Sequence, residues 1–445
     1  MNAGTTAKTL RISSAVLISA LIFFPSILGE IASVRLWAIG IGLVALAIET
    51  ALSKRSIRAR VLTVACAAVA TATLLTVIEL MAAHLGARAF AVNGEHLLVL
   101  LPLFAATGAQ IMRSGMGRTY LTVGITAAAL VALLALVEFA GDFSVLGREY
   151  MFLTSQREGP TRALVGSEHV LVLGATLAAF VPLTSMIRRA PLRLTAGAVI
   201  LLGTWASGSR VPAAIATLVF LVQSVPVVKS FVVRNTRYLI LLAAFAIAAL
   251  AICAAFVWSP YIGGESGLDF SANYRFASYA VLPQVLLTLP LGYLLVGAPD
   301  GAWVVGSASR GQVDLGMSAD SELLYAAFTL GWVGVLLYLI VLFGSLRTLQ
   351  ENFAVGAAAS SVAVMGFSLA LHGWDGMSNL WYLLIGACAY LLGRQHLARR
   401  ARPPQHRHRH GTSIPGQGAV DTPRTGQPLN GVTLANPKRW SRGTK

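Results

Sequence analysis

The chain has 445 residues, of which 56% are hydrophobic and 12% are charged, and its mean hydropathy is +0.71. About a quarter of the residues of a soluble domain are charged, so these values exclude a wholly water-facing protein and predict that lipid covers much of the surface. The net charge of +16 does not indicate nucleic-acid binding, because the basic residues flank apolar runs in a one-sided pattern.

Twelve apolar runs are candidates for membrane-spanning helices, which need roughly 20 residues; of these, 194–208 is short and 96–112 is only just long enough. Lys8 and Arg11 precede the first run as in a secretory signal. No small-residue cleavage site follows, so we expect a retained helix. The predicted spans are 12–29, 34–53, 61–82, 96–112, 119–140, 169–187, 194–208, 211–228, 238–258, 321–345, 353–371 and 378–395. The fold class expected is therefore an all-α integral membrane protein with about 12 transmembrane helices.

The distribution of Lys and Arg predicts which side of the membrane each loop faces. With the N-terminus inside, 26 of the 34 Lys and Arg residues fall on inner segments and 8 on outer segments. Cytoplasmic loops of membrane proteins carry such an excess of positive charge. We therefore expect a multi-pass membrane protein with both termini in the cytoplasm.

Two of the predicted outer loops are long, 141–168 and 259–320. The second contains the apolar stretch 273–297, which Pro283 and Pro290 interrupt. Because proline breaks a helix interior, we expect one or two amphipathic helices at the outer leaflet rather than a span.

The residues from 398 to 445 are rich in Pro, Gly, Arg and His and predict a disordered basic cytoplasmic tail after a membrane domain of residues 1–397. The HRHRH run at 406–410 is interpreted as a solvated basic segment attracted to anionic lipid, with metal binding as the alternative.

Charged residues are scarce inside the predicted spans. Glu49, Glu79 and Glu138 lie near span ends, where we interpret them as interfacial. An ion-coupled transporter usually carries ionisable groups near the membrane midplane. Their scarcity here favours chemistry at the outer surface over transport.

Two arginines are the first candidates for that chemistry. Arg210 follows Ser-Gly-Ser between two apolar helices, and Arg275 begins the amphipathic stretch of the large outer loop. A guanidinium binds phosphate oxygens through two parallel hydrogen bonds and stays charged. Each is therefore either a fixed anion site or an interfacial arginine in contact with lipid headgroups. Two outer arginines beside an apolar groove would suit a lipid with a diphosphate headgroup.

Two carboxylates at the predicted outer mouth of span 321–345 are the next candidates. Asp320 and Glu322 flank Ser321. Asp320 or Ser321 could cap the helix, with Glu322 favourable in its first turn. Alternatively, Asp320 is a general base that takes a proton from an attacking hydroxyl.

Further outer-loop residues could contact a glycan. They are Arg157, Arg162 and His169 in REGPTRALVGSEHV, and His372 and Asp375 in LHGWDGMSN. The sequence contains no Gly-rich phosphate loop, no paired Asp-x-Asp motif and no HExxH motif. No metal site and no cofactor is therefore expected, and nucleotide-dependent chemistry has no visible site.

Three segments resemble, in the same order, elements of the O-antigen ligase and polysaccharide polymerase superfamily. SGSR resembles the family's Ser-Arg-Gly-Ala element and carries its arginine onto Arg210. NYRFASYAVLPQVLLTLPLGYLLVG resembles the outer-loop stretch whose arginine falls on Arg275. SADSELLYAAFTLGWVG resembles the family's His-Asn-x-x-Leu…Glu-x-Gly-x-x-Gly element. The stretch from Arg157 to His169 resembles, more weakly, an outer loop of the family that contains arginine and glycine. In two departures, Asp320 stands where the ligases have histidine and Thr329 replaces the glutamate, which is closer to a polymerase.

The resemblance implies a glycosyltransferase of a bacterial cytoplasmic (inner) membrane that moves a glycan from a polyprenyl-diphosphate carrier to an acceptor on the outer face of that membrane. The acceptor would be a glycan, a lipid or a cell-wall component. The resemblance makes Arg210, Arg275, Asp320 and Glu322 the expected catalytic residues. Whether the chain is a ligase or a polymerase stays open, and the alternative of another class is a flippase for lipid-linked glycans.

Overall fold

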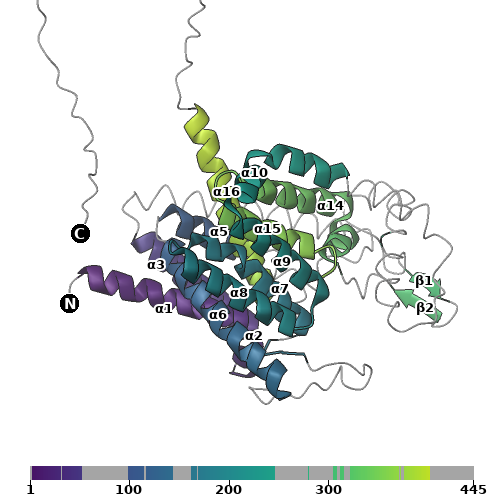
Figure 1. Cartoon of the computed structure of the whole chain (residues 1–445), viewed down its shortest axis with the longest axis horizontal. Helices are drawn as coiled ribbons and strands as arrows, with labels where there is room; N and C mark the ends of the chain where they lie inside the picture. Colours follow the sequence, from purple (N-terminus) through teal and green to yellow (C-terminus); the bar gives the residue numbers. More distant parts are fainter. Residues whose placement is uncertain are drawn as a thin grey trace, which may run out of the picture. The chain divides into compact units, whose positions relative to one another are not determined.

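In the computed structural model of the chain, the described residues are 3–31, 33–52, 99–114, 117–143, 162–167, 169–245, 279, 304–307, 311–314, 321–369, 371 and 375–400. Helices dominate them (Figure 1). The elements are α1 (Ala3–Phe23), α2 (Pro25–Ile31), α3 (Val34–Ala51), α5 (Leu101–Arg113), α6 (Gly117–Gly141), α7 (Val170–Phe180), the 3₁₀ helix η3 (Pro182–Met186), α8 (Ala190–Ala206), α9 (Arg210–Ser224), α10 (Pro226–Arg234), β1 (Val304–Ser307), β2 (Gly311–Asp314), α14 (Glu322–Thr348), α15 (Phe353–Met365) and α16 (Asp375–Arg400).

Five helices of the described residues are long and apolar enough to cross a membrane, or six if the bent pair α9–α10 is one span. They are Thr5–Phe23, Val34–Ala51, Gly117–Gly141, Leu330–Thr348 and Asp375–Gln395. Shorter apolar helices are Val170–Met186, Ala190–Ala206, Thr236–Phe245 and Phe353–Met365. The chain thus has the helices of an α-helical membrane protein, and the count of twelve spans stays a prediction. The predicted span 61–82 lies outside the described residues.

Prolines subdivide three of the predicted spans. Pro25 begins α2 after α1 ends at Phe23, Pro182 begins η3 after α7, and Pro226 begins α10 after α9. Proline lacks the N–H that a helix interior requires but fits a first helical turn. At Pro226 the direction changes by 103°, so the predicted span 211–228 ends at Ser224 and α10 is a separate segment.

The large loop 259–320 contains strands that the all-α prediction did not include. β1 and β2 pair antiparallel, with Val304 opposite Asp314 and Ser307 opposite Gly311. Of the stretch 273–297 that we expected to be amphipathic helix, the structure describes Tyr279, which is helical.

Contacts between helix ends show which ends of the described helices lie together. Near the start of α1, Arg11 contacts Glu49 near the end of α3. Near the end of α9, Gln223 donates to Thr184 in η3. At the other end of the bundle, Ser209 before α9 donates to the carbonyl of the first residue of α7. Each contact joins segments that the charge pattern assigns to the same side.

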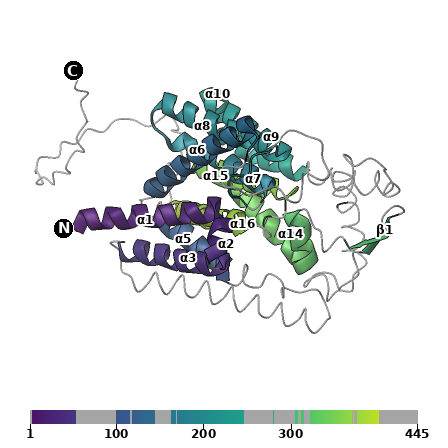
Figure 2. The ribbon, with the colours of Figure 1, turned by 90° about the horizontal axis from the view of Figure 1, so that it is seen from below.

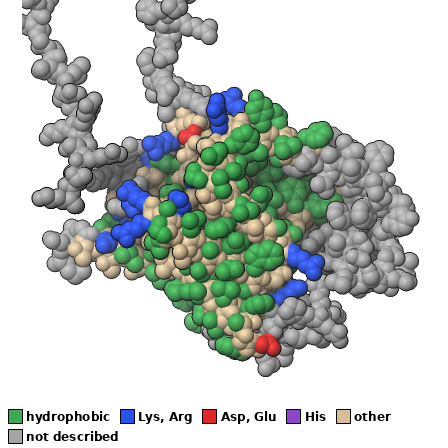
Figure 3. Space-filling view, viewed as in Figure 1, with side chains coloured by type: hydrophobic (Ala, Val, Ile, Leu, Met, Phe, Trp, Pro, Cys, Tyr) green, Lys and Arg blue, Asp and Glu red, His purple; other side chains and the backbone are tan. Residues whose placement is uncertain are grey.

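We call one end of the helix bundle the basic end. Its described basic residues include Lys8, Arg11, Arg113, Arg118, Arg188, Arg189, Arg193, Lys229, Arg234, Arg237, Arg347 and Arg394. The opposite end carries Arg35, Arg162 and Arg210 among its described basic residues, together with Glu138, His169, Glu322 and Asp375. Figure 3 shows blue side chains gathered at the left and top of the view, with others at the right.

The outward faces of the helices are apolar. Leu130 on α6, Leu218 on α9 and Leu336 on α14 are each about 60% exposed, and many large apolar side chains share this exposure. Contiguous apolar surface of this extent marks a membrane or protein contact. It agrees with helices that face lipid.

Small residues let the central helices approach closely. α6, α7, α8 and α9 pack side by side, and α16 lies among the other helices (Figures 1 and 2). Gly108 on α5 faces the carbonyl of Leu383, and Gly386 on α16 faces the carbonyl of Ala105. A Cβ at either glycine would collide with backbone, so α5 and α16 cross where only glycine fits, as small residues permit in membrane helices.

A buried ion pair at the basic end corrects the interfacial interpretation of Glu49. Glu49 is fully buried, and its Oε1 accepts from Arg11 Nε at 3.0 Å and from the Tyr120 hydroxyl at 3.3 Å. Ser14 Oγ lies 2.8 Å from that hydroxyl, and Gln110 donates to the Glu49 carbonyl at 3.3 Å. This network ties α1, α3, α5 and α6 together.

Replacing Arg11 by Met is expected to destabilise the protein by about 3–5 kcal/mol, because it leaves the Glu49 carboxylate buried without its cation. The double variant Arg11→Met/Glu49→Leu is expected to recover much of the loss, since no buried charge remains. Thermal unfolding of the purified protein in detergent measures both. Arg118→Met, at an exposed arginine of the same end, is the control. A double variant no more stable than Arg11→Met would contradict this account.

Candidate functional site at the opposite end

Two buried serines shape the turn that presents Arg210. α8 ends at Ala206 and α9 begins at Arg210. Ser207 Oγ donates to the Thr204 carbonyl at 2.7 Å and accepts from the Ser209 N–H at 3.3 Å. Ser209 Oγ donates to the Val170 carbonyl at 2.9 Å, which fixes the turn against the start of α7. Arg210 follows these serines directly and is exposed.

A second segment, residues 162–167, lies against this turn. The Ala163 N–H donates to the Ala206 carbonyl at 3.1 Å. Glu138 Oε2 accepts from the N–H groups of Leu164 at 2.7 Å and Val165 at 2.9 Å. The Glu138 carboxylate is buried. It therefore holds backbone in place, which corrects the interfacial interpretation made from its position near a span end.

Gly208 brings Arg162 beside the same turn. Its φ of +68° lies in the left-handed region, which glycine adopts at no steric cost. A Cβ at Gly208 would lie 2.9 Å from Cδ and Nε of Arg162. The Arg162 side chain thus passes over Gly208, two positions before Arg210, and this turn gathers two guanidinium-bearing residues from separate segments.

His169 belongs to this cluster through the start of α7. It is the N-cap residue of α7, and its Nδ1 accepts from the Leu171 N–H at 3.2 Å. Its backbone precedes Val170, whose carbonyl accepts from Ser209. Of the residues predicted to contact substrate, the structure therefore brings together Arg162, His169 and Arg210.

A second group surrounds the start of α14. Ser321 is the N-cap residue and its Oγ accepts from the Leu324 N–H at 3.4 Å. The Glu322 N–H lies 2.7 Å from the Gly366 carbonyl and 3.0 Å from that of Leu369. The hydroxyl of Tyr279, in the large loop, lies 2.5 Å from Ser321 Oγ and donates to the Phe367 carbonyl. Glu322 itself is 8% exposed.

The N-cap residue of α14 is Ser321, so the helix does not need Asp320 as its cap. Asp375 begins α16 and is half-buried. The predicted residues Arg157, Arg275, Asp320 and His372 lie outside the described residues.

Sequence reasoning did not single out several residues that build the site. Glu138 and Tyr279 act on backbone groups far away in the chain, and no local pattern marks such contacts. The two serines of SGSR stood beside the predicted arginine. Gly174 on α7 has a Cβ position that faces Ser207 and Ser209, and as the glycine of an otherwise apolar helix it offered a weak signal.

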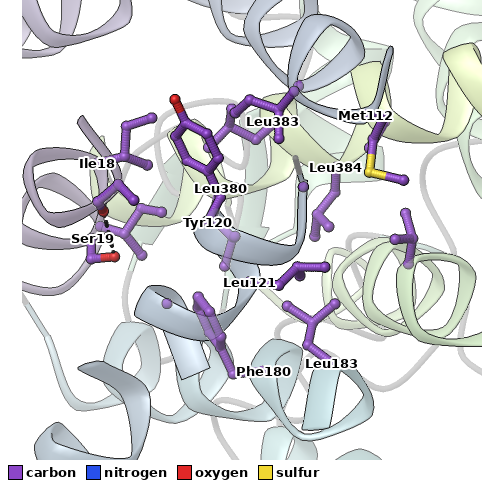
Figure 4. Close-up of a pocket in the computed structure, with 18 residues that line it drawn as sticks. Ile18, Ser19, Met112, Tyr120, Leu121, Phe180, Leu183, Leu380, Leu383 and Leu384 are labelled. Carbon is purple, nitrogen blue, oxygen red and sulfur yellow. Dashed lines mark hydrogen bonds between the residues drawn. The ribbon is translucent and has the colours of Figure 1, made fainter. Parts of the chain in front are cut away.

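Apart from this end, the bundle contains an apolar cavity (Figure 4). It spans about 680 Å³ of empty space, including the part that opens outward. Ile18, Leu121, Phe180 and Leu380 contribute to its walls, and the Tyr120 ring stands at one side. Its lining suits hydrocarbon. Within the described ranges, no group of three His, Cys, Asp or Glu side chains could hold a metal ion.

Comparison with known proteins gives no assignment, because no protein-family model, curated protein or solved structure matches the chain.

Replacing Gly208 by Ala is expected to destabilise the protein by about 1–2 kcal/mol, the cost of a left-handed backbone at a residue with a Cβ. It should also displace the Arg162 side chain, because the added methyl would overlap it. Thermal unfolding in detergent measures the first effect. Gly40→Ala is the matched control, since nothing lies within 4 Å of its Cβ position. Equal stability of the two variants would show that Gly208 is not needed for its conformation.

Proposed function

We propose that the chain is a glycosyltransferase of the membrane's outer face that moves a glycan from a polyprenyl-diphosphate carrier to an acceptor. It spans a bacterial cytoplasmic membrane with twelve helices, and both termini are cytoplasmic. The opposite end of the bundle then faces outward. The observation that carries the proposal is the packing of Arg162 across Gly208, next to the exposed Arg210.

The two arginines supply what the leaving group requires. A diphosphate gains negative charge as its bond to the anomeric carbon of the glycan breaks. Positively charged groups held in place beforehand stabilise that charge more in the transition state than in the ground state. Buried serines fix the turn that precedes Arg210 and that Arg162 packs across, so the backbone that presents these arginines is in place before the donor binds. Arg275 adds a third guanidinium from the large loop.

The acceptor reacts on the other side of the anomeric carbon. Its hydroxyl oxygen forms the new glycosidic bond, the hydroxyl proton passes to a carboxylate, and polyprenyl diphosphate leaves with the electron pair. Asp320 is the base in this proposal, because Ser321 occupies the capping role and Glu322 is buried. Arg157, His169, His372 and Asp375 contact the sugars. The reaction needs no nucleotide, because the donor is already activated.

A flippase for lipid-linked glycans is the second candidate. The buried Arg11–Glu49 pair favours it, because charged groups inside a helix bundle often line transport paths. An assay in detergent solution distinguishes the two functions. No compartments exist there, so a flippase forms no new covalent product, whereas a glycosyltransferase does.

The deciding experiment mixes purified protein in detergent with a defined polyprenyl-diphosphate oligosaccharide, with and without added acceptor. Mass spectrometry of the products should show either oligosaccharide of increased repeat number or glycan joined to the acceptor. Polyprenyl diphosphate should appear in equal amount. Absence of any product, while the same protein moves the lipid across liposomes, would replace the transferase by the flippase.

A further inference from the structure

The helix α10 leaves the direction of α9 at the basic end of the bundle. α9 ends at Ser224, Val225 is extended, and Pro226 begins α10. The two helices are bent by 103°, next to the contact between Gln223 and Thr184. α10 has 9 residues and is about 14 Å long, which is less than half of the hydrocarbon core of about 30 Å. A bend near 90° after a membrane-crossing helix leaves α10 close to the membrane plane.

One side of α10 rests on the bundle. Successive helical residues are about 100° apart, which places Lys229, Val232 and Val233 on one side, and all three are half-buried. The Lys229 ammonium lies over the Phe353 ring, 4.6 Å from its centroid, and such a pair is attractive. Val233 packs against a small apolar cluster that contains Phe353. α10 is therefore docked along this side.

The sides of α10 that face away from the bundle differ in polarity. Val227, Val228 and Phe231 lie within about 100° of one another and are 76%, 40% and 62% exposed. Ser230 and Arg234, in the neighbouring sector, are also exposed. A helix with an apolar side next to a polar, basic side is typical of one that lies in a membrane interface.

We propose that α10 is an interfacial helix that binds the lipid surface of the membrane leaflet at the basic end. Its apolar side, centred on Phe231, lies between acyl chains, and Arg234 lies at the level of the headgroups. Two observations favour lipid over a water-soluble partner protein. Leu218 and Leu221, in the last two turns of α9, are 63% and 57% exposed, so lipid-facing apolar surface reaches close to the bend. Arg234 and Arg237 are exposed and have the charge that anionic lipids attract.

This inference does not rest on glycosyl transfer, because it concerns the other end of the bundle. It rests on the membrane location of the helices and on the bend between α9 and α10. A loss of the proposed transferase activity would leave it unchanged.

Spin-label depth measurements on the full chain in nanodiscs of phosphatidylglycerol and phosphatidylethanolamine test the placement. The three native cysteines are first changed to alanine, and one exposed residue of α10 at a time is then changed to cysteine and labelled. Labels in Val227→Cys, Val228→Cys and Phe231→Cys should be reached by oxygen more than by a water-soluble nickel complex. They should lie about 5–10 Å inside the boundary of headgroups and acyl chains. The label in Ser230→Cys should instead be reached by nickel.

Two controls calibrate these measurements. Leu218→Cys on α9 gives the values for a lipid-facing helix, and Arg118→Cys, at an exposed position of the basic end, gives those for the aqueous surface. Labels at Val227 and Phe231 that match the Arg118 label would overturn the proposal, because the apolar side would then face water. Protection of these labels from both reagents would also overturn it, because a protein contact would then cover this side of α10.

Discussion

Replacing Arg210 by Lys is expected to lower the rate of glycan transfer about 10²–10³-fold, the range seen when one preorganised donor to developing charge is removed. Lysine keeps the positive charge but loses the planar fork that binds two phosphate oxygens at once. Because Arg210 is exposed and follows a turn held by Ser207 and Ser209, the fold should be unaffected. Product formation from a lipid-diphosphate donor measures the loss.

The control for this variant is Arg118→Lys at the basic end, which should transfer at the rate of wild type. Arg162→Lys should show a similar defect to Arg210→Lys if both guanidiniums bind one diphosphate. The double variant should then be less impaired than the product of the two single effects, because residues that act on one group are not additive. Near-normal turnover in both single variants would make the arginines interfacial anchors and remove the proposed diphosphate site.

Much of the helical architecture could be predicted from sequence. Long apolar runs with few charges gave α3, α6 and α16 close to their observed bounds, because the bilayer sets helix length. The pairing of helix ends agrees with the sides assigned from Lys and Arg. Bends could be predicted less well. Hydropathy averaged over a window of residues does not show that Pro182 and Pro226 each begin a new helical segment.

The roles of buried carboxylates could not be predicted from their positions along the helices. Glu49 and Glu138 both lie near helix ends, which suggests an interfacial place for each. Their burial depends on partners from other segments, namely Arg11 for Glu49 and the backbone of residues 164–165 for Glu138. Such contacts arise when the helices pack, and nothing in the local sequence specifies them.

Only part of the candidate site could be predicted, because some of its residues also meet only when distant segments pack. The SGSR turn consists of consecutive residues, and its small side chains indicated that two helices approach each other closely beside Arg210. The neighbouring position of Arg162 depends on Gly208, which lies more than 40 residues further along the chain. It also depends on the hydrogen bonds from residues 164 and 165 to Glu138, which is 26 residues before Leu164. Sequence therefore indicated which residues to consider, and packing decided which of them meet.

Asp320→Asn is expected to lower turnover about 10²–10⁴-fold, the contribution usual for a general base, with donor binding largely retained. Asparagine has nearly the same size as aspartate but accepts no proton at neutral pH. It also caps a helix about as well as aspartate, and Ser321 already caps α14. Loss of activity in this variant therefore cannot be attributed to a lost cap. Single-turnover transfer and donor binding, measured separately, distinguish the two effects.

A second variant, Glu322→Gln, tests which of the two carboxylates, Asp320 or Glu322, is the general base. Glu322 is 8% exposed, and its backbone is bonded to the segment after α15, so an acceptor hydroxyl has poor access to its carboxylate. We expect this variant to keep most of its activity, whereas Asp320→His should be partly active, because histidine also accepts a proton. The reverse result, with Asp320→Asn fully active and Glu322→Gln inactive, would move the base to Glu322. Full activity in both would move it to His372 or Asp375, which precede and begin α16.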